Sequence, residues 1–97
     1  MKLPQAVATV QIDNERVRVT EWRFAPGAAT GYHRHEYEYV VVPMTTGKLL
    51  LDEPEGKRFA QLHAGVPYTR PAGVEHDVIN ANAFPFVFIE IEIKHKS

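Results

Sequence analysis

The chain has 97 residues, which suffice for one domain around one compact core and are too few for two. Its 11 basic and 12 acidic side chains give a net charge of −1, and this balance argues against a nucleic-acid-binding surface or a polybasic membrane patch. Because the chain has no cysteine, disulfides, thiol nucleophiles and cysteine-based zinc sites are excluded, and a bound metal would need His and carboxylate ligands.

Short runs that alternate between apolar and polar residues, interrupted by Gly and Pro, predict β-strands along the chain. In the first run, residues 16–24, the apolar residues change parity between Val19 and Trp22, which predicts a β-bulge near Thr20–Glu21. The later predicted strands are, in chain order, 31–42, 47–52, 57–63, 66–70, 75–80 and 86–94.

The last run alternates most regularly: its β-branched residues share one face, and Glu90 and Glu92 share the other. We interpret the acidic face as exposed to solvent. No window shows a helical period, and roughly seven or eight short strands with turn signals every ~8–12 residues are typical of a β-sandwich or small barrel. We expect residues 1–97 to form this single domain.

The histidines suggest a metal site. His33 and His35 are two residues apart in a run predicted to be extended, so their side chains point to the same face. His76 follows the turn at 71–73 and begins the next predicted strand. Three neutral imidazoles can hold a divalent transition metal and leave coordination positions open.

Glycines, prolines and histidines recur at fixed spacing in two segments, about 27–47 and about 65–80, with a short segment between them. The positions are Gly27, His33, His35 and Gly47 in the first segment, and Gly65, Pro71, Gly73, His76 and Asn80 in the second. This spacing resembles the two signature motifs of the cupins, which are small jelly-roll β-barrels with two antiparallel sheets. The stretches "VRVTEWRFAPG" and "YEYVVVP" are further similar to compact cupins linked to β-alanine degradation.

This resemblance implies a metal held by the histidines of both motifs, usually together with a glutamate from the first motif. Carried over by position, His33, His35 and His76 would bind one divalent transition metal, with Fe, Ni, Mn and Zn all open. In the family the glutamate stands four or five residues after the second histidine, where this chain has Tyr39 and Val40. The carboxylate ligand is therefore missing from its usual place.

Strand parity places Tyr37 and Tyr39 on the same side as the histidines and Glu36 and Glu38 on the other. Glu38 is a possible fourth ligand only if a β-bulge changes the register between residues 35 and 38. Without the bulge the site has three histidines and open positions, an arrangement that also occurs among cupin thiol dioxygenases.

Further side chains are expected near the site. Tyr68 and Arg70 share parity before the turn, and with Tyr37 they are candidate substrate-binding residues. Arg70 could hold a carboxylate through two hydrogen bonds, or it could lie at the rim and pair with a surface acid. Tyr39 is the candidate catalytic acid, base or positioning group. Asn80 is expected to bond to backbone rather than to a metal.

Residues outside the motifs have simpler interpretations. Trp22, Phe24 and Phe88 are expected to be core or dimer contacts, because aromatic side chains at strand spacing usually pack. His63 and His95 have no partners at ligand spacing and are expected at the surface.

The leading functional hypothesis is a metal-dependent cupin that acts on a small organic, carboxylate-bearing substrate. An Fe(II) dioxygenase is the favoured version; an isomerase or decarboxylase would use Mn, Ni or Zn. The alternatives are a non-catalytic module that binds a metal or small ligand, and a structural barrel that has lost its metal. We expect a homodimer formed with strands from residues 5–24, and neither nucleic acid nor membrane as a partner. A cytoplasmic location is expected, because no signal peptide and no apolar run of ~20 residues is visible.

Overall fold

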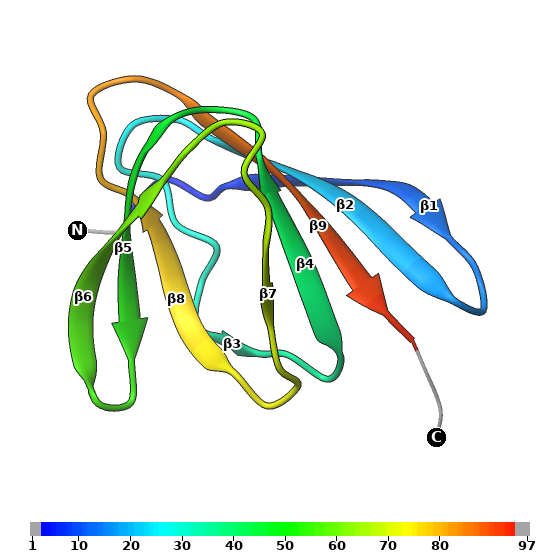
Figure 1. The fold of residues 1–97 in the computed structure, drawn as a ribbon. Helices are drawn as coiled ribbons and strands as arrows, with labels where there is room; N and C mark the ends of the chain where they lie inside the picture. The colour runs from blue at the N-terminus through cyan, green and yellow to red at the C-terminus, as the bar shows by residue number, and fades with distance from the viewer. Residues whose placement is uncertain (1–2, 95–97) are drawn as a thin grey trace.

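A computed structural model describes residues 3–94, and within this range the chain is all-β, with two sheets that face each other (Figure 1). The predicted all-β fold with two antiparallel sheets is confirmed. No helix in residues 3–94 is long and apolar enough to cross a membrane. The strands are β1 (Val7–Asp13), β2 (Val17–Phe24), β3 (His33–Arg34), β4 (Glu38–Pro43), β5 (Gly47–Glu53), β6 (Gly56–Leu62), β7 (Tyr68–Arg70), β8 (Glu75–Asn80) and β9 (Phe86–Ile93).

The strands pair in an order that differs from their order in the chain. The larger sheet has the order β1-β2-β9-β4-β7, and the smaller sheet has the order β3-β8-β5-β6. All of these pairings are antiparallel. Figure 1 shows that the β1–β2 hairpin extends beyond the other strands at one side.

The predicted run 31–42 divides into two strands that belong to different sheets. β3 pairs with β8 in the smaller sheet, whereas β4 pairs with β9 and β7 in the larger one. A bend at Glu36–Tyr37 separates the two strands. Its position matters for the site, because the chain crosses from one sheet to the other immediately after His35.

The β-bulge predicted in the first run was wrong. β2 pairs with β9 without interruption, and the register shift lies in β1 instead, between Val10 and Ile12. The parity change in the sequence arises because β2 has apolar residues on both faces. Val17 and Val19 lie on the outer face of the larger sheet, opposite isoleucines of β9. The inner face carries Thr20 and, further along the strand, apolar side chains.

Along β2 and β9 the inside of the barrel changes from apolar to polar. At one end Phe24 is the cross-strand partner of Phe86, and both side chains are buried. Towards the other end Thr20 pairs with Glu90, and both are also buried. The apolar end forms the hydrophobic core, and the histidines lie at the polar end.

Candidate metal centre

The pairing of β3 with β8 places two histidines opposite each other. His33 is the antiparallel partner of His76, and cross-strand partners project to the same face of a sheet. Just beyond β3, the His35 N–H donates to the Val74 carbonyl oxygen at 2.8 Å. The Gly73 N–H donates to the His35 carbonyl oxygen at 2.9 Å, and Gly73 has a φ of +93°, which favours glycine. The turn of the second motif therefore extends the pairing to His35.

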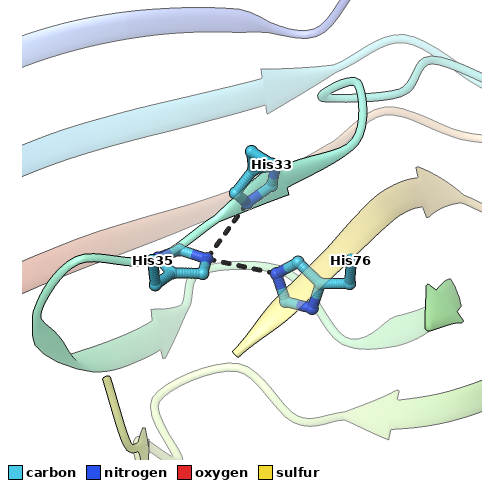
Figure 2. A group of neighbouring side chains, drawn as sticks. All are labelled: His33, His35 and His76. Carbon is cyan, nitrogen blue, oxygen red and sulfur yellow. Dashed lines mark hydrogen bonds between the residues drawn. The ribbon is translucent and has the colours of Figure 1, made fainter. Parts of the chain in front are cut away.

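The three imidazole rings meet at their Nε2 atoms, as Figure 2 shows. The Nε2 atom of His35 lies 3.0 Å from that of His33 and 3.1 Å from that of His76. His35 and His76 are buried, and His33 is half-buried. Two nitrogens bound at right angles to one metal, each at ~2.1 Å, would lie ~3.0 Å apart. The observed spacing therefore fits ligands of a single ion.

Contacts on the other sides of the rings set their orientation. The Nδ1 atom of His33 lies 2.8 Å from the carbonyl oxygen of Gly31, and only an Nδ1–H can donate this bond. When the His33 ring is neutral, this bond leaves the lone pair on its Nε2 atom. The ring of His35 stacks on the ring of Tyr39, with 3.9 Å between centroids and 17° between planes. Such supporting contacts orient the ligands in protein metal sites.

The protonation of the rings favours a cation between them. Burial lowers the pKa of His35 to about 4 and that of His76 to about 3, and the nearby His33 adds to both shifts. Both rings are therefore neutral near pH 7, and a neutral ring carries a single N–H. At most one of the two Nε2···Nε2 contacts can then be an ordinary hydrogen bond. A divalent transition metal would satisfy all three lone pairs at once.

An internal cavity adjoins the histidines between the two sheets. Besides Thr30 and apolar core side chains, it is lined by His33, His76, Tyr39, Tyr68, Arg70 and Glu90. The Tyr39 hydroxyl is buried and has no hydrogen-bond partner within residues 3–94. Burial also raises the pKa of Tyr39, so this hydroxyl keeps its proton. Arg70 is the cross-strand partner of Tyr39 and lies 3.5 Å from the Glu53 carboxylate. Arg70 thus both lines the cavity and pairs with an acid.

Two other predicted site residues lie elsewhere. Glu38 is exposed at the first position of β4, and it belongs to neither group of candidate ligands found in residues 3–94. After the bend, the odd-numbered residues of β4 again face inward, as His33 and His35 do before it. Tyr39 therefore points inward and Glu38 outward. The structure does not support Glu38 as the fourth ligand. Tyr37 is half-buried in the bend and does not line the internal cavity.

Glu90 and Glu92 were wrongly predicted to be exposed. Only 9% of Glu90 and 8% of Glu92 are accessible to solvent. β9 lies in the middle of the larger sheet, and its inner face continues from Phe86 and Phe88 to these two glutamates. The sequence held a signal for this arrangement, because the glutamates share the parity of the phenylalanines. Burial raises the pKa of Glu90 to about 7, with the charge of Glu92 as the next cause.

The remaining predictions concern residues away from the metal centre. Phe24 and Phe88 are buried in the core, and Trp22 packs against it, as expected for core contacts. His63 is exposed, also as expected. His95 lies outside the described residues.

Comparison with known proteins finds relatives that cover nearly all of the chain. A family model described as "Cupin domain" matches residues 20–92. The β-alanine degradation protein BauB of Pseudomonas aeruginosa is 67% identical over 91 residues, which cover 94% of this chain and 96% of that protein. The crystal structure of a cupin domain from Bordetella pertussis Tohama I has a TM-score of 0.96 and 67% identity, and the match covers 98% of this chain and 99% of that one. The polyketide cyclase RemF from Streptomyces resistomycificus shares the fold, with a TM-score of 0.72 at 22% identity over 98% of this chain and 71% of that one.

Proposed function

This chain belongs to the cupin family, and from that premise we propose that it is a metal-dependent enzyme acting on a small, carboxylate-bearing organic substrate. The observation that supports the proposal best is the convergence of three Nε2 atoms at 3.0 and 3.1 Å beside an internal cavity. The name of the 67% identical Pseudomonas protein refers to β-alanine degradation, and it favours a substrate of the size of a small amino acid or oxo acid.

The cavity residues suggest how such a substrate would bind. When bound, the metal would supply a Lewis-acidic centre with open positions and, if it is iron, redox chemistry with O₂. Arg70 would hold the substrate carboxylate through its guanidinium group. The buried hydroxyl of Tyr39 would donate a hydrogen bond to the substrate, because it keeps its proton and has no other partner in the described structure. We favour Fe(II) and a dioxygenation, with Mn, Ni or Zn as the metals of an isomerase or decarboxylase.

One observation favours a second candidate, a non-catalytic module that binds a metal or small ligand. The internal cavity is small, with room for about one ordered water molecule beside its lining. A substrate bound inside this cavity would need side chains such as Tyr68 to move, whereas a metal alone would not. A larger open pocket of about 450 Å³ reaches His33 and His35 from another side and could take a substrate without such movement.

Oxygen uptake tests the enzyme against the binding module. We expect the Fe(II)-loaded protein to consume O₂ with at least one member of a panel of small thiols, amino acids and 3-oxo acids. An Arg70→Gln variant should raise the KM for that substrate at least about tenfold, because it removes a charge-assisted hydrogen bond worth about 1.5–3 kcal/mol. Steady-state kinetics with an oxygen electrode measure both effects.

Arg58→Gln is the matched control for Arg70→Gln. Arg58 pairs with the same Glu53 carboxylate but does not line the internal cavity. Equal changes in both variants would refute the role of Arg70. Absence of uptake with every class in the panel, in protein shown to bind metal, would favour the binding module.

We further propose a homodimer. The outer face of the larger sheet carries half-buried apolar side chains, namely Val17, Val19, Val40, Val42, Ile89, Ile91 and Ile93. All of β1 is exposed, and Ile12, which is the cross-strand partner of Val19 on this face, retains 49% of its accessible surface. Contiguous exposed apolar surface of this kind marks interaction sites.

The cytoplasmic location and the absence of nucleic-acid and membrane partners stay predictions.

An Ile12→Lys variant should shift the protein from dimer to monomer, because the new charge would have to be buried in the interface. Sedimentation velocity at equal chain concentrations measures the change. Phe59→Lys is the control, since Phe59 is 62% exposed on β6 of the other sheet. A wild-type protein that sediments as a monomer would contradict the proposal.

A further inference from the structure

Glu90 is a buried carboxyl group that forms no ion pair within residues 3–94. It retains 9% of its accessible surface and lines the internal cavity. The indole N–H of Trp22 is near enough to favour the charged form of Glu90, but it completes no hydrogen bond in the described structure. An ionised carboxylate in this position is costly, and the cost is removed either by a proton or by a cation that reaches the carboxylate.

Glu92, the other buried acid of β9, already has its cation. The Nε atom of Arg18 lies 2.5 Å from one oxygen of the Glu92 carboxylate, and its Nη2 atom lies 3.0 Å from the other. This two-bond pairing occupies both carboxylate oxygens. Of the two glutamates, only Glu90 is left to bind something else.

Glu90 also lies close to the histidine cluster. One ligand atom each of His35, Glu90 and Glu92 lie within 4.8 Å of one another. A metal bound at ~2.1 Å to both a nitrogen and a carboxylate oxygen needs these two atoms ~3–4 Å apart. Glu90 also lines the same internal cavity as His33 and His76, so its carboxylate and these two imidazoles border a common space.

The pairing of β4 with β9 places the glutamates next to the position where the first motif lacks its own. Tyr39 occupies that position, its cross-strand partner is Glu92, and Glu90 is opposite Val41. An inner-face carboxylate of β9 therefore approaches the histidines from the neighbouring strand.

We propose that Glu90, supplied by β9, is the carboxylate ligand of the metal centre and takes the place of the absent glutamate of the first motif. This inference rests on the proposed function, since it requires a metal at the three histidines. With Glu90 the ion has three neutral ligands and one anionic ligand, so the site selects for a divalent cation and moderates its Lewis acidity.

The test compares metal binding by the full chain with that of three variants. Competition with a chelator gives the Kd for Zn(II), and the visible absorption of the Co(II)-loaded protein reports the ligand set. Glu90→Gln should raise the Kd at least about tenfold and alter the Co(II) bands, given that even the loss of an outer-shell partner costs ~10–100-fold. Glu90→Asp keeps the charge but shortens the reach, and it should also raise the Kd. Glu38→Gln is the matched control and should change the Kd less than about twofold.

The outcomes separate this inference from the function on which it rests. If the wild-type chain binds Zn(II) and Co(II) but both Glu90 variants match it while folded by circular dichroism, Glu90 is not a ligand and the metal centre stands without it. If Glu38→Gln rather than Glu90→Gln weakens binding, the carboxylate comes from the first motif after all. If the wild-type chain binds neither metal, the proposed function and this inference both fall.

Discussion

A His76→Ala variant is expected to lose its metal, falling from about one ion per chain in the wild type to close to none. His76 is buried and lies directly across from His33, so its removal leaves two of the three converging imidazoles. We expect the affinity to fall at least ~100-fold, more than the ~10–100-fold typical for loss of an outer-shell partner. Elemental analysis of protein purified without added metal measures the content of Fe, Mn, Ni and Zn.

His63→Ala is the matched control for this experiment, since His63 is exposed and lies outside the histidine cluster. The variant should keep the wild-type metal content. Little metal in the wild type, with no further loss in His76→Ala, would contradict both the enzyme and the binding module. The remaining hypothesis would be a structural barrel that has lost its metal.

The sequence predicted the histidine cluster because two short-range patterns determine it. Residues two apart on a strand share a face, which aligns His33 with His35. The turn before His76 needs a residue with positive φ, and Gly73 supplies it. The motifs could not reveal that the ring of His35, which follows β3 of the smaller sheet, stacks on the ring of Tyr39, which lies in β4 of the larger sheet. That contact depends on how the two sheets face each other.

The burial of Glu90 could not be predicted from alternation alone, for a physical reason. Alternation says that Glu90 and the isoleucines of β9 lie on opposite faces, but it does not say which face is inside. Hydrophobicity suggested that the isoleucines were inside. The structure has the reverse, because the barrel places its polar site on the inner face and leaves an apolar outer face. The two faces of β9 are thus linked: because the acidic face is buried beside the histidine cluster, the apolar face must be the half-buried outer one.

Asn80, the last residue of the second motif, should have the largest effect on stability. Its side chain is 2% exposed, and its Nδ2 atom donates to the carbonyl oxygens of Phe24, Ala25 and Phe84 at 3.3, 3.2 and 2.9 Å. Its Oδ1 atom accepts hydrogen bonds from the backbone and the side chain of Asn82 at 2.9 and 2.7 Å. These bonds tie β8 to the end of β2 and to the loop before β9, which agrees with the predicted backbone-bonding role.

We expect Asn80→Ala to lower the free energy of unfolding by about 3 kcal/mol, because each hydrogen bond contributes ~1 kcal/mol and the buried carbonyl groups lose their donor. For a chain of this size that change lowers the Tm by about 12–24 °C. Asn80→Asp should be worse, since a carboxylate would face carbonyl oxygens. Asn14→Ala is the control: Asn14 accepts backbone bonds in an exposed turn, and its loss should cost about 1 kcal/mol.

Thermal unfolding at a fixed chain concentration, with excess chelator, measures these differences without a contribution from metal binding. The metal content of folded Asn80→Ala, measured separately below its Tm, should equal that of the wild type, because Asn80 lies outside the histidine cluster. A stable Asn80→Ala protein that had lost its metal would reverse both expectations and make Asn80 part of the site. A destabilised protein that keeps its metal would show that the second motif has two separable roles: His76 binds the ion, and Asn80 holds the strand that carries it.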